Sequence, residues 1–187
     1  MSGTAGLILA AGAGTRFGGT KQLADLRGKP LLEHALAAML GASLDRVIVV
    51  LGHEADQIRS RVSFGDAEIV IASEWSTGQA ASLRAGVRAA VGASAVVITL
   101  GDQPLITSEV ISAALDQLPG YDAVRAVYDG KPGHPVVFGE PVIKAAGSIE
   151  GDVGARDILS RFNVNRWDAS DLASAVDVDT REELDAL

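Results

Sequence analysis

Near its N-terminus the chain reads Leu7-Ile-Leu-Ala-Ala-Gly-Ala-Gly-Thr-Arg-Phe-Gly-Gly-Thr-Lys21. The apolar residues at its start are typical of a buried strand, and the glycines at 12, 14, 18 and 19 predict a loop directly after that strand. Glycine has no Cβ, so the N–H groups of such a loop can approach an anion closely, while Arg16 and Lys21 add positive charge there. The stretch therefore predicts a loop that binds the phosphates of a nucleoside triphosphate.

The composition favours a packed α/β fold. The chain has 187 residues, of which 48% are hydrophobic and only 4% aromatic. Such a chain is long enough for a full hydrophobic core, and its aliphatic residues suit a parallel sheet that is buried by helices on both faces. No repeat, linker or low-complexity segment interrupts it, so we expect a single domain over residues 1–187.

Charge and residue usage exclude several classes of protein. A formal net charge of −8 argues against a nucleic-acid partner, although local cations can still bind a small anion. The absence of cysteine excludes disulfides, thiolate metal sites and cysteine nucleophiles. No uncharged apolar run approaches the roughly 20 residues of a membrane span, and the first residues lack a basic signal-peptide region. We therefore expect a cytoplasmic protein without a membrane partner.

The order of predicted elements indicates a doubly wound sheet. Strands are expected at 46–51, 67–72 and 94–100, separated by helices at about 30–40 and 54–62 and by a helix after Gly78 with Leu83, Val87 and Val91 inside. A further helix begins at Thr107 or Ser108. The second half is less regular, with strands at 122–128 and 135–138 joined by a turn at 129–134, helices at 140–146 and 152–161, a strand at 164–167, a strand end near 176–179, and a last helix capped by Thr180. This order predicts a three-layer α/β/α, Rossmann-like fold with a mostly parallel sheet.

An acidic residue follows the predicted strand at 94–100. That strand ends in Gly101-Asp-Gln-Pro104, and ligands of open α/β sheets bind beyond the carboxyl ends of the strands. Asp102 is therefore expected to face the same crevice as the glycine loop. A carboxylate beside a triphosphate is well placed to hold Mg²⁺, which prefers one or two protein carboxylates together with phosphate oxygens.

Other phosphate-binding loops fit less well. A dinucleotide loop requires G-x-G-x-x-G with an acidic residue near the end of the second strand, whereas here the glycine spacing is G-x-G-x-x-x-G and that strand ends in Leu51-Gly-His53. In a Walker loop, Lys precedes Ser or Thr, the reverse of Thr20-Lys21. A plain surface turn does not explain two cations among four glycines after a buried strand.

Several motifs, in order along the chain, resemble the MobA-like NTP transferases, and within them the molybdenum cofactor cytidylyltransferases. Leu9-Ala-Ala-Gly12 with Arg16 and Lys21 is similar to the family's L-A-A-G-x-x-x-R-x-G…K loop. Further similar segments are Gly78-Gln-Ala-Ala-Ser-Leu83, Gly101-Asp-Gln-Pro104, Gly133-His-Pro-Val136, Gly151-Asp-Val-Gly-Ala-Arg156 and Asp177-Val-Asp-Thr-Arg-Glu-Glu-Leu184, the last with Arg181 in place of the usual proline.

The resemblance implies a nucleotidyl transfer from a nucleoside triphosphate to a phosphomonoester, with release of pyrophosphate. It implies catalytic roles for Arg16 on the β- and γ-phosphates, for Lys21 on the α-phosphate and the acceptor phosphate, and for Asp102 on Mg²⁺. Asp177 is implied as the second metal ligand, with Asp179 left as the alternative. The implied nucleotide-binding residues are Leu9, Ala10, Ala11, Gly12, Gly14, Thr15, Arg16, Lys21, Gly78 and Ser82.

The resemblance also suggests the substrates. The family's loop has L-A-A-G with pyrimidine triphosphates and L-A-G-G with GTP, so Ala11 favours CTP, with UTP as the competitor. The implied acceptor is a molybdopterin-type cofactor bound by the half at about 107–187, where His134 and Asp152 are candidate contacts, while the half at about 1–106 binds the donor. A molybdoenzyme that receives the product is an implied further partner.

Alternatives stay open at this point. His134 can equally be an ordinary loop histidine, and Asp152 can be the N-cap of a helix. The acceptor can be another small phosphomonoester, such as a sugar phosphate, methylerythritol phosphate or phospholactate. A nucleotide-binding regulator or cofactor chaperone without transfer activity is the competing class, since function does not follow from fold alone.

Overall fold

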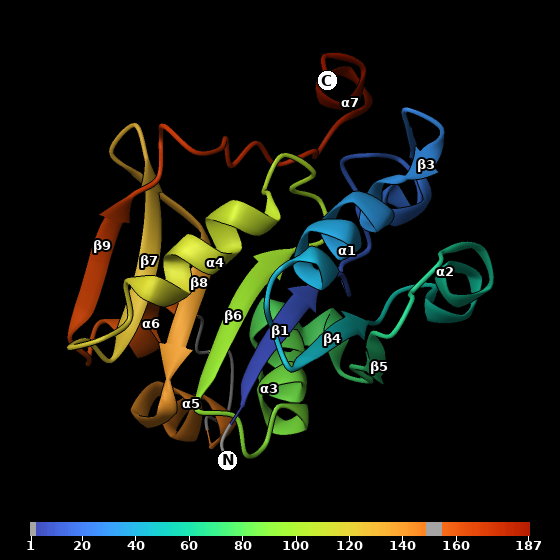
Figure 1. Cartoon of the computed structure of the whole chain (residues 1–187). Coiled ribbons are helices and arrows are strands. Elements are labelled where there is room, and N and C mark those ends of the chain that lie inside the picture. The colour runs from blue at the N-terminus through green and yellow to red at the C-terminus, as the bar shows by residue number, and fades with distance from the viewer. Residues whose placement is uncertain (1–2, 149–154) are drawn as a thin grey trace.

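The computed structural model describes residues 3–148 and 155–187. Seven of its strands form one sheet in the order β5-β4-β1-β6-β8-β7-β9 (Figure 1). These strands are β1 (Thr4–Leu9), β4 (Arg46–Leu51), β5 (Glu68–Ile71), β6 (Ala95–Leu100), β7 (Ala123–Tyr128), β8 (Lys131–Gly139) and β9 (Val164–Asp168). Neighbours are parallel except for β8, which runs antiparallel to both β6 and β7. The predicted mostly parallel sheet is confirmed.

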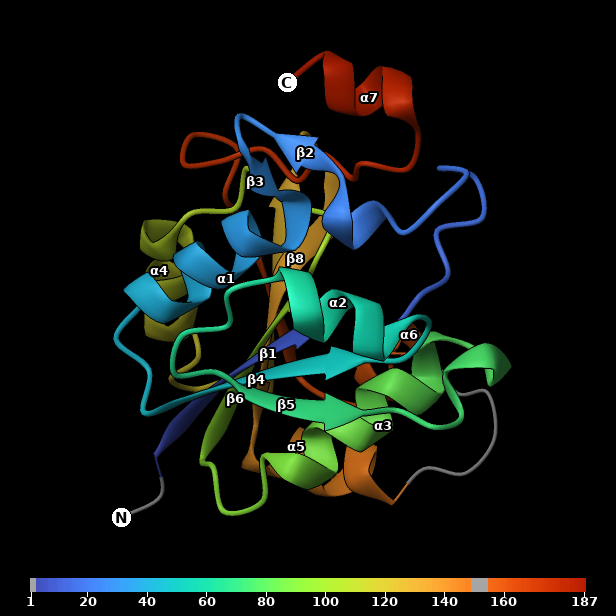
Figure 2. The same cartoon turned by 90° about the vertical axis from the view of Figure 1, so that its right-hand side faces the viewer.

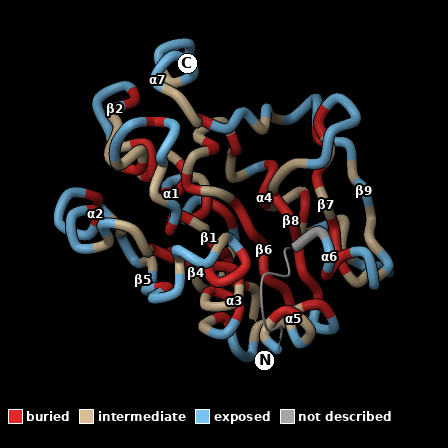
Figure 3. The backbone as a smooth tube through the Cα atoms, turned by 180° about the vertical axis from the view of Figure 1, so that it is seen from behind, coloured by how far each residue is buried: buried red, intermediate tan, exposed pale blue. Residues whose placement is uncertain are grey.

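Helices cover both faces of this sheet, which gives the three predicted layers (Figures 1 and 2). The apolar cluster on one face includes residues of α1 (Leu31–Gly41), α2 (Ala55–Arg61) and α4 (Ser108–Asp116). The cluster on the other face includes residues of α3 (Gln79–Ala89), α5 (Glu140–Gly147) and α6 (Ala155–Leu159). The central strands are buried between the two clusters (Figure 3), as their continuous apolar sequences predict.

Small elements complete the chain around the ends of β1 and β6. They are the 3-10 turns η1 (Lys21–Leu23) and η2 (Trp75–Thr77), the short hairpin of β2 (Asp25–Leu26) and β3 (Lys29–Pro30), and the last helix α7 (Arg181–Asp185). Figure 2 shows α7 above this hairpin, although the two lie at opposite ends of the sequence. A third apolar cluster joins these regions through the buried side chains of Phe17, Leu26, Leu31 and Val178.

Two local predictions for the second half of the chain are wrong. Residues 176–179 form no strand. The turn before the strand predicted at 135–138 is shorter than expected, because Asp129 and Gly130 both adopt positive φ, of 51° and 76°, and close a two-residue hairpin. Strand β8 therefore begins at Lys131, and His134 lies on a strand instead of in a loop. Residues 152–154, predicted to begin a helix, lie outside the described residues.

The order of the strands determines where a crevice for ligands lies. Within the sheet, β4 and β5 lie on one side of β1. The chain passes through these two strands first and then returns to form β6 on the other side of β1. Such a reversal opens a crevice beyond the carboxyl ends of the two strands. The glycine loop after β1 and the turn after β6 meet in this crevice.

Candidate active site

A cavity of about 400 Å³ lies at this crevice. It is lined by all ten residues that the sequence predicts to bind a nucleotide, Leu9, Ala10, Ala11, Gly12, Gly14, Thr15, Arg16, Lys21, Gly78 and Ser82. Asp102 at the end of β6 lines it as well. The fold thus brings residues from β1, the loop after it, α3 and β6 into one cavity.

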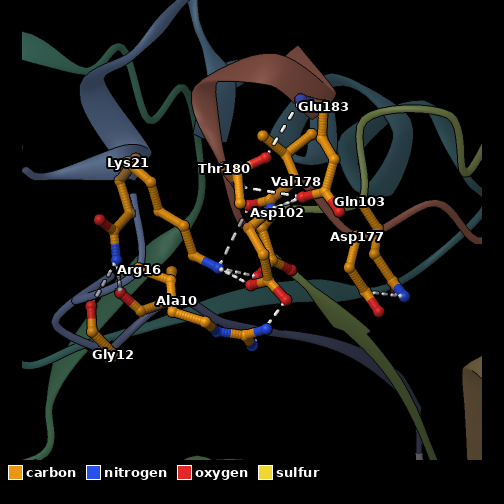
Figure 4. Close-up of polar contacts among 12 residues, drawn as sticks. Ala10, Gly12, Arg16, Lys21, Asp102, Gln103, Asp177, Val178, Thr180 and Glu183 are labelled. Atoms are coloured by element: carbon orange, nitrogen blue, oxygen red, sulfur yellow. Dashed lines mark hydrogen bonds and ion pairs between the residues drawn. The ribbon is translucent and has the colours of Figure 1, made fainter. Parts of the chain in front are cut away.

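A buried glutamine shapes the glycine loop. Gln22 Nε2 donates hydrogen bonds to the backbone carbonyls of Ala10 and Gly12, both at 2.9 Å (Figure 4). Gly14 adopts a φ of +60°, and a Cβ there would lie 3.0 Å from the carbonyl oxygen of Gly19. The side chain of Gln22 and the left-handed backbone of Gly14 therefore fold the loop back on itself. No sequence pattern indicates the role of Gln22, because a polar residue beside a turn is ordinary.

Two cations and two carboxylates meet at one end of the cavity (Figure 4). Lys21 Nζ forms ion pairs with Asp102 and, at 3.1 Å, with Asp179. Arg16 contacts the other oxygen of Asp179 at 2.7 Å. Lys21 is largely buried, with 13% of its side chain exposed, whereas 75% of the Arg16 side chain is exposed. Lys21 is therefore fixed between carboxylates, and Arg16 reaches in from solvent.

The charge of Lys21 is maintained by its partners. Burial by itself would lower the pKa of this amine, but the charges and hydrogen bonds of Asp102 and Asp179 outweigh burial and raise it. The amine is therefore a permanent cation at this end of the cavity. A permanent cation suits a site where negative charge develops on phosphate oxygens.

The C-terminal segment crosses the end of β6 and closes this end of the cavity. The N–H of Val178 donates to the carbonyl of Asp102 at 3.0 Å, and Gln103 Nε2 donates to Asp177 Oδ1 at 2.7 Å. Burial raises the pKa of Asp177, helped by the negative charges of Asp102 and Asp179 and opposed by the Gln103 hydrogen bond. Asp179 lines the cavity and pairs with both cations, whereas Asp177 turns toward Gln103 (Figure 4).

The oxygens at this end fit a hard cation. Asp102 Oδ1 is buried and has no hydrogen-bond partner, while Oδ2 of the same carboxylate faces Lys21. Within residues 3–148 and 155–187, no group of three or more acidic, histidine or cysteine side chains is arranged to hold a metal by itself. A pair of carboxylates is nevertheless what Mg²⁺ commonly takes from a protein, because water and phosphate oxygens supply the remaining ligands.

An aromatic side chain forms another part of the cavity wall. Trp75 in η2 lines the cavity together with Ala11, Gly78 and Ser82. A Cβ on Gly52 would lie 2.5 Å from Trp75 Cβ and 2.9 Å from Ala11 Cβ, so Trp75 and Ala11 are packed closely around this glycine. The cavity therefore combines the charged side chains of Arg16, Lys21 and Asp102 with walls formed by Ala11, Gly78 and Trp75.

The predicted acceptor residue His134 lies elsewhere. His134 lines a second cavity of about 260 Å³ together with Arg125, a residue that the sequence analysis did not single out. Burial, together with the nearby charge of Arg125, lowers the pKa of His134 to about 4. The hydroxyl of Tyr128 donates to the carbonyl of His134 at 2.7 Å, and burial raises the pKa of Tyr128 to about 12. Asp152 lies outside the described residues.

Comparison with known proteins identifies the family. The MobA-like NTP transferase domain matches residues 6–167, so the chain belongs to this family. It is also 34% identical to the nicotine blue oxidoreductase of Paenarthrobacter nicotinovorans, over 96% of this chain and 93% of that protein.

Two proteins of known structure share the fold. Rv0371c from Mycobacterium tuberculosis H37Rv superposes with a TM-score of 0.89 and 27% identity over 99% of this chain and 96% of that one. The molybdopterin-guanine dinucleotide biosynthesis protein A of Archaeoglobus fulgidus gives a TM-score of 0.75 and 22% identity over 97% of this chain and 95% of that one. Rv0371c has also been solved as a complex with manganese, which superposes with a TM-score of 0.79 and 23% identity over 99% and 97% of the two chains. Among the described helices, none has the length and apolar character needed to cross a lipid bilayer.

Proposed function

We propose that this member of the family is a Mg²⁺-dependent nucleotidyltransferase that moves CMP from CTP to the phosphate of a molybdopterin-type cofactor. The convergence of Arg16, Lys21 and Asp102 in one cavity, beyond the ends of two neighbouring parallel strands, carries the proposal. A protein that only binds a nucleotide does not require a buried lysine next to a carboxylate that can hold a metal ion. A cytoplasmic location and a single domain, with donor-binding residues mainly in 1–106 and acceptor-binding residues in 107–187, belong to this proposal.

The reaction needs positioning and charge stabilisation, and no side-chain nucleophile. An oxygen of the acceptor phosphate attacks the α-phosphorus of CTP, the bond from that phosphorus to the bridging β-oxygen breaks, and pyrophosphate leaves with the electron pair. Lys21 neutralises charge at the α-phosphate, and Arg16 binds the leaving phosphates through its planar fork. Asp102 would hold Mg²⁺, with Asp179 or Asp177 as the second carboxylate, and the bound ion would neutralise negative charge on the phosphates.

The base preference rests on the family's pattern and on local packing. Ala11 carries a methyl group where the GTP-using pattern has glycine, and this methyl group is closely packed with Trp75 around Gly52. A rigid wall at this end leaves less room for a purine than for a pyrimidine, which excludes the larger base sterically. CTP is therefore the proposed donor and UTP its competitor.

A panel of substrates tests the proposal. Purified protein with Mg²⁺ is mixed with each of the four nucleoside triphosphates and with molybdopterin, a sugar phosphate, methylerythritol phosphate or phospholactate, and pyrophosphate release is measured. Release is expected with CTP and molybdopterin. It should disappear in Asp102→Asn, whose folding is checked by thermal unfolding. No release with any pair favours a non-catalytic nucleotide or cofactor chaperone, and CTP binding that is independent of Mg²⁺ would support that class.

A second candidate follows from the oxidoreductase relative. The similarity to nicotine blue oxidoreductase extends over 96% of the chain, so an oxidoreductase acting on a comparable compound deserves a direct assay. The same protein is mixed with NADH or NADPH and nicotine blue, and absorbance is followed. Loss of both the reduced nucleotide and the dye, without pyrophosphate release in the transferase panel, would replace the transferase proposal.

A further inference from the structure

Arg181, at the start of α7, is a charged side chain to which the proposed reaction assigns no role. Its guanidinium carbon lies 5.0 Å from the centre of the Phe17 ring, a distance at which a cation is attracted to an aromatic face. A Cβ on Gly19 would lie 3.9 Å from Arg181 Nη2, so the guanidinium lies beside this glycine as well. The helix itself does not explain a cation here, because the first turn of a helix favours negative charge. Arg181 is therefore accounted for by its contact with the glycine loop.

Phe17 links Arg181 to the residue that is proposed to bind the leaving phosphates. The Phe17 side chain is only 5% exposed and belongs to the third apolar cluster, which holds the ring in place from below. The N–H of Phe17 donates to the carbonyl of Gly14 at 2.9 Å and closes the turn that carries Arg16. A fixed ring therefore fixes this turn, and the turn determines from where the exposed Arg16 side chain extends.

The C-terminal segment contacts the same turn a second time, through Asp179. Asp179 pairs with Arg16 at 2.7 Å (Figure 4), and its N–H donates to Glu183 at 2.7 Å beside the capping box of α7. When Arg16 binds phosphate, it exchanges the carboxylate of Asp179 for phosphate oxygens, so this ion pair is lost or weakened. The contact between Arg181 and Phe17 uses no group that is proposed to bind phosphate. It therefore persists when the ion pair is lost.

We infer that Arg181 is a positioning residue, which holds Phe17 and so keeps Arg16 directed at the β- and γ-phosphates of the donor. This inference rests on the proposed function, because it takes Arg16 as the ligand of these phosphates. It assigns part of the affinity for the outer phosphates, and none of the affinity for the base or the ribose, to a contact between the glycine loop and α7.

Binding of CTP and CMP to the full chain separates this role from a general structural one. Both ligands carry the same base and ribose, but only CTP carries the phosphates assigned to Arg16. In the presence of Mg²⁺, Arg181→Met should weaken CTP binding by about two- to fivefold, the size of one exposed cation–π contact, and leave CMP binding unchanged. Arg181→Lys keeps a cation and should retain part of the CTP affinity.

Calorimetry measures CTP directly and CMP by displacement of CTP. If another triphosphate binds the unmodified chain more tightly, it and its monophosphate form the pair. An unchanged ratio of the two dissociation constants in Arg181→Met, or equal weakening of both ligands, overturns the inference. Absence of binding by all four triphosphates overturns it as well.

Two further variants test the contact itself. Phe17→Leu removes the ring and keeps an apolar side chain, so adding Arg181→Met to it should cause little further loss of CTP affinity. Proline is tolerated at the first position of a helix, so Arg181→Pro removes the cation without breaking α7 and should match Arg181→Met. Additive losses in the double variant would contradict a shared contact. Arg166→Met, at an exposed position of β9, is the matched control and should bind both nucleotides as the unmodified chain does.

Hydrogen exchange tests the contact without any ligand. The amide of Phe17, which donates to Gly14, should exchange about two- to fivefold faster in Arg181→Met than in the unmodified chain, because the turn opens more often. Its exchange should be unchanged in Arg166→Met. Equal exchange in Arg181→Met and in the unmodified chain overturns the inference.

Failure of this inference and failure of the transferase proposal give different results. A loss of CTP affinity without loss of CMP affinity in Arg181→Met, in a protein that never releases pyrophosphate, supports the positioning role and removes the reaction. Pyrophosphate release by a protein in which Arg181→Met leaves the ratio of the two affinities unchanged supports the reaction and removes the positioning role.

Discussion

At the scale of single residues, Lys21 has the most constrained environment in the candidate site. It is largely buried and contacts two carboxylates, one from the end of β6 and one from the C-terminal segment. A buried lysine is tolerated only when its charge is compensated, and here Asp102 and Asp179 compensate it before any substrate binds. A triphosphate that binds Arg16 and Lys21 would compete with Asp179 for both cations. A divalent cation between the phosphates and these carboxylates would relieve that competition.

Removing the Lys21 charge should affect the chemical step. In Lys21→Met the negative charge that develops in the transition state loses a fixed cation, so we expect the rate of pyrophosphate release to fall by about 10²-fold or more. Lys29→Met, at an exposed position in β3, is the matched control and should keep the unmodified rate. A Lys21→Met variant that is folded and fully active would contradict the role proposed for this residue.

His134 should make the stability of the protein depend on pH. Burial and Arg125 lower its pKa from 6.5 in the unfolded chain to about 4 in the folded protein. Between these values the unfolded state binds more protons, so the free energy of unfolding should decrease as the pH falls from 6.5 to about 4, with no further loss from this group below that range.

The contribution of His134 is isolated by comparing variants. Urea unfolding of His134→Gln across this range should show a shallower pH dependence than the unmodified chain. His53→Gln, which removes a histidine from the loop beside Trp75, controls for the loss of an imidazole elsewhere. Equal slopes in the unmodified chain and in His134→Gln would contradict the assigned pKa.

At the scale of elements, the C-terminal segment closes the phosphate end of the site. Thr180 and Glu183 form a capping box that begins α7, as predicted for Thr180. Just before this cap, Val178 is fully buried against Phe17, Leu26 and Leu31, and its N–H binds the carbonyl of Asp102. The segment therefore attaches the glycine loop and the hairpin after it to the end of β6, and it brings Asp179 to the two cations.

Shortening Val178 should loosen this attachment. Val178→Ala removes two buried methyl groups and should lower the free energy of unfolding by about 1–3 kcal/mol. The apparent affinity for CTP should fall as well, because the loop that holds Arg16 loses its support. Val176→Ala, two residues earlier and 37% exposed, is the matched control and should change neither quantity appreciably. Chemical denaturation and calorimetry with CTP measure the two effects, and equal behaviour of the two variants would argue against the attachment.

At the scale of the whole molecule, the helices and the sheet approach each other closely where the site is built. Helix α3 packs on β1 through Gly86, where a Cβ would lie 2.4 Å from Leu7 Cδ1 and 2.9 Å from Val50 Cγ2. This contact allows the N-terminal end of α3, with Gly78 before it and Ser82 in it, to reach the cavity beyond β1. The short distance between α3 and the sheet is therefore needed to build the site.

The substitution Gly86→Ala tests whether the gain in helix propensity or the cost of overpacking has the larger effect on stability. Alanine favours a helix interior over glycine by about 1 kcal/mol, but overpacking against Leu7 is expected to cost more, with a net loss of about 1–2 kcal/mol of stability. Gly147→Ala at the end of α5, where a Cβ would meet nothing within 4 Å, should be neutral or stabilising. Thermal unfolding of both variants checks this, and a stabilised Gly86→Ala would show that the layers can move apart at little cost.

The fold was largely predictable because its signals are local. Continuous aliphatic runs such as 46–51 and 95–100 are typical of central strands, and the glycines after the run that begins at Leu7 favour a loop. The failures also have local causes. Val91 was expected inside a helix, but α3 ends at Ala89, and Val91 is 78% exposed beyond it. The strand expected near 176–179 does not form; instead the N–H of Val178 donates to the carbonyl of Asp102, and Asp177 accepts from Gln103.

The sequence by itself determined the class of fold, the loop after β1 and the residue types at the phosphate end of the site, because these depend on periodicity, glycine spacing and motif order along the chain. The tertiary structure alone decided which carboxylate of the C-terminal segment faces Lys21, that Gln22 holds the glycine loop, and that Arg125 joins His134 in a second cavity. These contacts join residues far apart in the chain or depend on the direction of a side chain. Contacts between distant residues and side-chain directions are both set when the chain folds, and no local sequence pattern predicts them.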